Sequence, residues 1–386
     1  RFFHYKMDQK IHNLFAFVSA RYDVIQEEWN GINLEVYHHR THNYNVDKLM
    51  EGMKKSIEYY NELYGPYPYR QCRILEFPYG SYAASFPNTI PFSENIGFVM
   101  DIDPDDPEDL DMPFWVTAHE MGHQWWPHQV SGGNVQGSGF LSEGLAEYSA
   151  VSLLEKEKGE KQLRKFLKYE LDKYLMGRYS EQKFEPTIVQ TENHPYIHYN
   201  KAGLMMYTLS DFIGKDVFNS ALGRFIDKFR YQSNPYTNIG EFVKTIREDT
   251  PDDLQYLITD TFEKITLYEN KAKEASAVEN EDGTFTVTIE VEAKKVYSDS
   301  LGNQTNAELN DWLEIGVLGE TLVNGDMEEI PIYLEKVLIA DSLTTFTVQV
   351  DQKPIKAGID PMHKFVDRDS DDNLVRVIIE DGKKSQ

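Results

Sequence analysis

The residues best suited to chemistry lie in the segment His119-Glu120-Met121-Gly122-His123. Residues four apart on a helix share a face, so His119 and His123 would project together and could bind one metal ion. Glu120 lies beside them, where it could act as a general base on a water molecule held at that metal. This spacing predicts a zinc site with two histidine ligands and an adjacent catalytic glutamate.

The third ligand that a catalytic zinc requires is expected from the segment Phe140 to Tyr148. Glu143 and Glu147 are four residues apart, so on a helix they share a face, beside apolar neighbours. Because a carboxylate that faces a core needs a partner, a zinc ion would satisfy Glu143. We assign Glu143 as the ligand and Glu147 as an acceptor for the ring N–H of a ligand histidine. The alternative for Glu147 is a plain surface carboxylate.

The stretches HEMGHQWW and LSEGLAEY resemble the gluzincin zinc metallopeptidases of the aminopeptidase N and leukotriene hydrolase type. The resemblance implies one zinc ion per chain and an α+β fold. That fold would be a thermolysin-like, mostly helical catalytic domain with a small mixed sheet, followed by a β-sandwich domain. The chain departs from the family pattern at Ser142, where asparagine is usual, and in a slightly longer glycine-rich loop before it.

Two further segments gain a role through this resemblance. Family aminopeptidases carry a Gly-x-Met-Glu-Asn motif on an edge strand that pairs with the peptide substrate, and its glutamate holds the substrate's α-amine. Here Glu94 and Asn95 keep the last two positions, which implies that both bind substrate and that Glu94 anchors the ammonium group. Tyr199 resembles the family tyrosine whose hydroxyl donates to the oxyanion. The alternatives are an ordinary edge-strand glutamate and a tyrosine that only packs.

Hydrophobic periodicity predicts the elements that position these residues. Strands are expected over 14–24, 32–38 and 73–77, and helices over 46–64, 142–158, 162–175, 217–229, 239–248 and 251–265. Later segments alternate apolar and polar residues, which is typical of an antiparallel β-sandwich; they are 284–291, 313–318, 330–334, 344–350 and 374–379.

Three parts of the chain are therefore expected. Residues 1–28 would be the remnant of an N-terminal β domain, because most of the domain that precedes the catalytic part in the family is missing. Residues 29–270 would form the zinc peptidase domain. Residues 271–386 would comprise a polar linker, over 271–281, and the C-terminal β-sandwich domain.

The composition of the chain disfavours some classes of binding partner. The formal net charge of −25 disfavours nucleic acid and anionic membranes, and a single cysteine excludes an internal disulfide framework. No apolar run reaches the length of a membrane span. The chain also resembles peptidase domains associated with bacterial ABC-type permeases. That likeness implies an extracytoplasmic domain of a larger membrane protein, soluble as this fragment.

Three functional hypotheses follow. The first is a zinc aminopeptidase that releases N-terminal residues, with a peptide as its substrate. The second is a zinc endopeptidase of the same fold, which a blocked peptide substrate would reveal. The third is a non-catalytic, zinc-stabilised ectodomain that acts as a binding or regulatory module of a membrane transporter assembly. Glu120 and Tyr199 argue against the third, because a purely structural zinc needs neither residue.

Overall fold

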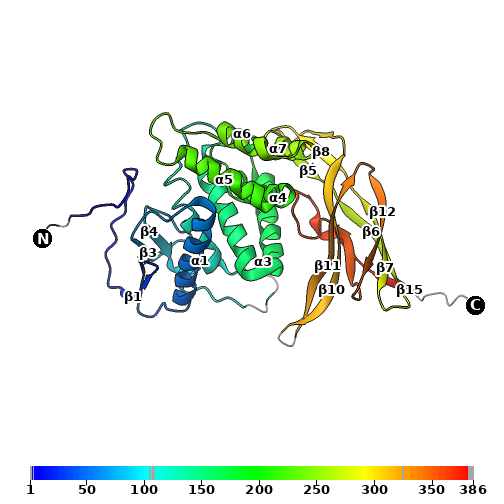
Figure 1. Cartoon of the computed structure of the whole chain (residues 1–386), viewed down its shortest axis with the longest axis horizontal. Coiled ribbons are helices and arrows are strands. Elements are labelled where there is room, and N and C mark those ends of the chain that lie inside the picture. The colour runs from blue at the N-terminus through cyan, green and yellow to red at the C-terminus, as the bar shows by residue number, and fades with distance from the viewer. Residues whose placement is uncertain (1, 3, 104–105, 107–108, 324–325, 381–386) are drawn as a thin grey trace, which may run out of the picture. The chain divides into compact units, whose positions relative to one another are not determined.

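The computed structural model describes residues 2, 4–103, 106, 109–323 and 326–380. The chain divides into two compact units (Figure 1). The first comprises Arg1–Tyr174 and Pro186–Glu263, and the second comprises Leu175–Glu185 and Lys264–Gln386. The α+β class predicted from the sequence is confirmed. The domain limits at residues 28 and 270 stay predictions.

A four-stranded mixed sheet belongs to the first unit, with the strand order β1-β2-β3-β4. Its members are β1 (Asp23–Trp29), β2 (Ile32–His38), β3 (Gln71–Phe77) and β4 (Thr89–Ser93). Strand β1 is antiparallel to β2, whereas β2, β3 and β4 run parallel. The predicted strand over 14–24 is wrong, because only residues 23 and 24 of it enter β1. Residues 14–22 pair with no strand among those described.

The outer edge of β4 is partly paired by the chain itself. Ala83 forms an antiparallel bridge with Phe92, and the backbone N–H of Ala84 donates to the carbonyl of Pro91 at 3.0 Å. The N–H of Ser93 donates to the carbonyl of Tyr82 at 3.1 Å. Residues 82–84 therefore cover part of the outer edge of β4.

Helices supply most of the rest of the first unit. Helix α1 (Val46–Tyr64) has the predicted bounds, because apolar residues at helical spacing fill its buried face. The other helices are α2 (Met112–Gly122), α3 (Leu145–Ser180), α4 (Ala202–Ile213), α5 (Lys215–Phe229), α6 (Ile239–Asp249) and α7 (Gln255–Phe262). Helices α4 to α7 gather together (Figure 1). The two helices predicted over 142–158 and 162–175 are confirmed as the two halves of α3, which are separated by a kink at Gly159 (φ 77°, ψ −177°).

Helix α2 is buried from Pro113 to Gly122. It begins where the carboxylate of Asp111 accepts the N–H of Phe114, which satisfies one of the free donors of the first turn. Its other side packs on the sheet, where the thiol of Cys72 on β3 lies 3.5 Å from the sulfur of Met121. Burial raises the pKa of the Cys72 thiol to about 11. The helix that carries His119 thus contacts the sheet through this buried pair of sulfur atoms.

The second unit is built from strands. Two four-stranded sheets have the orders β11-β10-β13-β14 and β12-β7-β6-β15, and a three-stranded sheet has the order β5-β8-β9. The strands are β5 (Ile265–Tyr268), β6 (Lys271–Glu279), β7 (Phe285–Glu292), β8 (Lys295–Ser298), β9 (Gln304–Asn306), β10 (Asp311–Val323), β11 (Asp326–Ile339), β12 (Leu343–Val350), β13 (Lys356–Ile359), β14 (Leu374–Arg376) and β15 (Ile378–Glu380).

The expected linker over 271–281 is wrong, because residues 271–279 form β6 between β7 and β15. Its inward positions are alanines, at 272, 275 and 277, and all three are buried. Alanine gives a weak hydrophobic signal, so the charged residues that alternate with it dominate the sequence pattern.

Candidate metal centre and its surroundings

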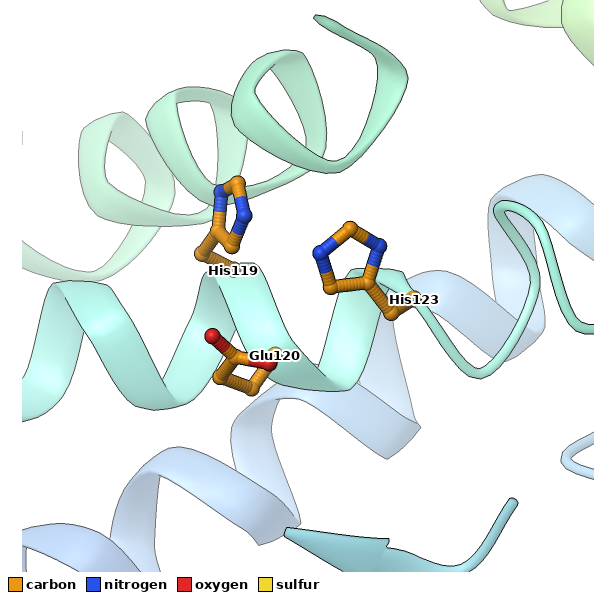
Figure 2. A group of neighbouring side chains, drawn as sticks. All are labelled: His119, Glu120 and His123. Carbon is orange, nitrogen blue, oxygen red and sulfur yellow. The ribbon is translucent and has the colours of Figure 1, made fainter. Parts of the chain in front are cut away.

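Three ligand atoms converge at the candidate metal centre. His119 lies on α2, His123 follows the last residue of that helix, and Glu143 lies in the short turn η2 (Phe140–Gly144). The Oε2 atom of Glu143 is 3.5 Å from Nε2 of His119 and 3.2 Å from Nε2 of His123. Zinc bonds of about 2.0–2.2 Å at tetrahedral angles place ligand atoms roughly 3.4 Å apart. Figure 2 shows both imidazoles on the same side of α2.

The other ring nitrogen of each histidine lies close to an oxygen atom, in a hydrogen bond for His123 and in an ion-pair contact for His119. The Nδ1 atom of His123 is 2.6 Å from the carbonyl oxygen of Trp126, and Nδ1 of His119 is 2.7 Å from Oε2 of Glu147. Both acceptors favour the tautomer with hydrogen on Nδ1, so each Nε2 lone pair faces the shared point beside Glu143. Two such nitrogens and one carboxylate oxygen are a donor set that fits zinc.

Electrostatics keep Glu143 in the form that binds a cation. Burial opposes its ionisation, but His123 and His119 outweigh burial and lower the pKa of Glu143. Burial also opposes protonation of His119, yet Glu147 and Glu143 raise its pKa. Protons and a metal ion therefore compete for the same imidazole nitrogens.

Glu120 lies next to this group. One ligand atom from each of His119, Glu120 and His123 lies within 4.8 Å of the others. Burial raises the pKa of Glu120, while His123 and His119 oppose that rise. A carboxylate with a raised pKa is a better proton acceptor than an exposed one, which is what a general base requires.

Tyr199 comes from the short helical turn η4 (Tyr196–Lys201). Its ring stacks on His119, with centroids 5.8 Å apart and an interplanar angle of 26°. Burial, together with the nearby Glu143 carboxylate, raises the pKa of Tyr199. The hydroxyl therefore keeps its proton at neutral pH and can donate a hydrogen bond beside the ligands.

Glu94 and Asn95 lie in the helical turn η1 (Glu94–Phe98), which directly follows β4 and contacts α2. One ligand atom of Glu94 lies within 4.8 Å of one from His42 and one from Glu76. Asn95 donates from Nδ2 to the carbonyl of Gly80 at 3.0 Å.

Two glycines allow the close packing around the ligands. A Cβ at Gly122 would lie 3.1 Å from the backbone of Ala146, so glycine lets α2 approach α3. A Cβ at Gly203 would lie 2.4 Å from Cγ of Glu147, so glycine makes room for the carboxylate behind His119. The sequence analysis did not single out either residue, although Gly122 lies inside the His-Glu-Met-Gly-His segment.

Glu170 is a second buried carboxylate that the sequence analysis missed. It lies on α3, and its Oε2 accepts a hydrogen bond from Nδ2 of Asn200 at 2.8 Å. Burial and the neighbouring Glu147 raise the pKa of Glu170. The available signal was an acidic residue on the apolar face of the predicted helix over 162–175, between Leu167 and Leu171.

His128 makes the stability of the folded chain sensitive to acid. Burial, reinforced by His123, lowers the pKa of His128 to about 3. Its Nε2 is 3.0 Å from the carbonyl oxygen of Ser85. Below an ordinary histidine pKa of about 6.5, the unfolded chain takes up a proton that the folded chain refuses. The contribution of this neutral imidazole is therefore complete above pH 6.5 and falls as the pH drops toward 3.

We expect His128→Gln, whose amide can still donate to Ser85, to reduce this dependence. Between about pH 6 and pH 4, its free energy of unfolding should fall less steeply than that of the parent chain, by about 1.4 kcal/mol per pH unit. Urea unfolding at several pH values measures the difference between the two slopes. Equal slopes would show that His128 is not neutral in the folded chain.

Comparison with known proteins places the chain in a family. Residues 48–262, more than half of the chain, match the model of the peptidase family M1 domain. The chain therefore belongs to peptidase family M1, and the resemblance to gluzincin peptidases is confirmed. A search of curated proteins found no match.

Among solved structures, the crystal structure of Legionella pneumophila aminopeptidase A in complex with aspartic acid is similar to this one. The TM-score is 0.53 and the sequence identity is 16%, a likeness that shows the fold. The match covers 93% of this chain but only 38% of that protein, so the chain spans less than half the length of this relative.

The described residues contain no helix that is both long and apolar enough to cross a membrane.

Proposed function

We propose that this chain is a zinc-dependent metallopeptidase that acts as an aminopeptidase on peptides with a free N-terminus. The observation that carries the proposal is the convergence of His119, His123 and Glu143 beside Glu120. Membership of peptidase family M1 supports the reaction class.

The proposed roles follow from the positions of the side chains. His119, His123 and Glu143 would hold zinc, and Glu147 would orient the His119 ring through Nδ1. A zinc ion at this point supplies Lewis acidity, which polarises a carbonyl and lowers the pKa of water. Because both Nε2 atoms already lie within 3.5 Å of Oε2 of Glu143, the donor atoms need little rearrangement to bind the ion.

Glu120 acts as the general acid and base, and Tyr199 stabilises the oxyanion. Glu120 accepts a proton from the attacking water and later returns it to the leaving amine. The Tyr199 hydroxyl donates to the carbonyl oxygen as negative charge develops on it in the transition state. Its raised pKa keeps that donor proton in place.

Glu94 is the proposed anchor for the substrate's α-ammonium group, with Asn95 beside it. The carboxylate of Glu94 is partly exposed and lies near a second carboxylate, that of Glu76, so the local charge favours a cation. Because residues 82–84 already pair with β4, a bound peptide would extend the sheet along those residues instead.

The test is hydrolysis of a panel of aminoacyl fluorogenic amides and one N-acetylated peptide by the parent chain and by Glu94→Gln. We expect the parent to cleave only substrates with a free amine and to lose activity with a chelator. Glu94→Gln should raise KM for these substrates by roughly tenfold or more, because it removes a charge-assisted contact to the ammonium.

Glu27→Gln is the matched control, since Glu27 is an exposed carboxylate on β1 that pairs with Lys54. Cleavage of the acetylated peptide would instead identify an endopeptidase of the same fold. Absence of cleavage by zinc-loaded protein would favour the third hypothesis, a binding module of a membrane transporter assembly at an extracytoplasmic location. That hypothesis rests on sequence resemblance to permease-associated domains alone.

A further inference from the structure

A second group of potential metal ligands lies where three parallel strands end. Strands β2, β3 and β4 run parallel, so the segments that follow them all leave the sheet at the carboxyl ends of the strands. His42 follows β2, Glu76 is close to the end of β3, and Glu94 directly follows β4. One ligand atom from each of these three residues lies within 4.8 Å of the others.

Of the two distances from His42 to the carboxylates, one is shorter and the other is longer than the distance between two ligand atoms of a metal ion. Nδ1 of His42 is 2.5 Å from Oε1 of Glu76 and 3.9 Å from Oε2 of Glu94. Tetrahedral zinc needs roughly 3.4 Å between ligand atoms. A shift of His42 by about 1 Å away from Glu76 and toward Glu94 would equalise the two distances.

The exposure of the three side chains fits such a shift. His42 and Glu94 have exposed side-chain fractions of 27% and 30%, so both can move and an ion can enter. Glu76 is 5% exposed, and its carboxylate is fixed by a hydrogen bond from the backbone N–H of His39. The site thus has one fixed ligand and two adjustable ligands.

The charge of the group also favours a cation. Among the described residues, neither Glu76 nor Glu94 has a lysine or arginine within ion-pair distance, and His42 is the only side-chain nitrogen beside both. A nearly buried carboxylate with a second carboxylate nearby gains from a positive partner. One imidazole and two carboxylates form a donor set that divalent first-row metals such as zinc accept.

We propose that His42, Glu76 and Glu94 form a second divalent-cation site, distinct from the centre on α2, whose occupancy inhibits the peptidase. The inhibitory part rests on the proposed function, in which Glu94 anchors the substrate's ammonium group. A metal ion bound by Glu94 would exclude that ammonium, so zinc beyond the first equivalent should raise KM for free-amine substrates and leave kcat unchanged.

The first test counts bound zinc and needs no activity. The full chain is stripped with a chelator and dialysed against zinc chloride, and its zinc content is measured by mass spectrometry. We expect two zinc ions per chain for the parent, one for His42→Ala and one for His119→Ala. His39→Ala is the matched control and should keep two. Its ring centroid is 4.8 Å from that of His42, and the variant retains the backbone N–H that holds Glu76.

A parent chain that saturates at one zinc ion would overturn the second site, as would His42→Ala that binds as much zinc as the parent. Circular dichroism checks the fold of each variant. Glu94→Gln, at a partly exposed position, provides a second route to the loss of one zinc ion if His42→Ala does not fold. A chain that binds two zinc ions, but is inactive when only the first equivalent is bound, would contradict the proposed function and leave the second site standing.

Discussion

Glu120→Gln should lose peptidase activity while it keeps its zinc and its fold. The substitution preserves the shape of the side chain but removes the carboxylate that accepts a proton from water and returns it to the leaving amine. General acid–base catalysis contributes about 10²–10⁴-fold to a rate, so we expect kcat to fall by about that factor. Glu120 is buried, and burial raises its pKa, which favours the proton transfer that the substitution removes.

The measurement is kcat on an aminoacyl fluorogenic amide, with zinc content determined on the same sample. Glu62→Gln on α1 is the matched control, because Glu62 is an exposed carboxylate whose partner is Lys156 at the surface. It should retain parental kcat. If Glu120→Gln kept parental kcat with zinc bound, another group would have to be the base, and the roles proposed for the centre on α2 would be wrong.

Tyr199→Phe should lower kcat by about 10²–10³-fold and leave zinc content unchanged. The variant keeps the ring that stacks on His119 and removes only the hydroxyl. Loss of one preorganised donor to an oxyanion typically costs this factor. Since the donor acts mainly in the transition state, kcat and kcat/KM should fall together while KM changes little.

Tyr196→Phe, in the same helical turn, is the comparison variant. Its ring stacks on Tyr174 rather than on a ligand histidine, so its kcat should stay within about twofold of the parent. A Tyr199→Phe chain that lost zinc would indicate that the hydroxyl supports the ligands. A chain with unchanged kcat would mean that Tyr199 only packs against His119.

The sequence predicted those parts of the fold in which one periodicity dominates. The range 46–64 emerged as α1 because Leu49, Met53 and Ile57 mark a single buried face. The range 32–38 emerged as β2 because its residues alternate in polarity. Strand β6 was missed because its inward residues are alanines. The run over 14–22 has the composition of a strand because aromatic residues raise β-propensity, yet it pairs with no strand in the described part of the chain.

Some residues of the candidate site could likewise be predicted from local sequence, and others could not. His119 and His123 could be proposed from helical spacing, since local geometry sets which side chains share a face. Glu143 could be proposed because a carboxylate among apolar residues needs a partner. The grouping of Glu94 with His42 and Glu76 could not, because it depends on three strands running parallel, and strand order is a property of the whole sheet. The stacking of Tyr199 on His119 likewise joins segments 80 residues apart, and no local pattern encodes it.

Cys72, the only cysteine in the chain, lies where its reactivity can report the separation of α2 from the sheet. Its sulfur is shielded between β3 and Met121 of α2, and its raised pKa keeps it unreactive. Because Cys72 is fully buried, a thiol reagent should reach it when α2 separates from the sheet. The rate of modification therefore measures how often the centre opens, and zinc bound to α2 should slow it by stabilising the closed form. The same shielding means that the protein can be handled without thiol reductants, which would themselves compete for the metal.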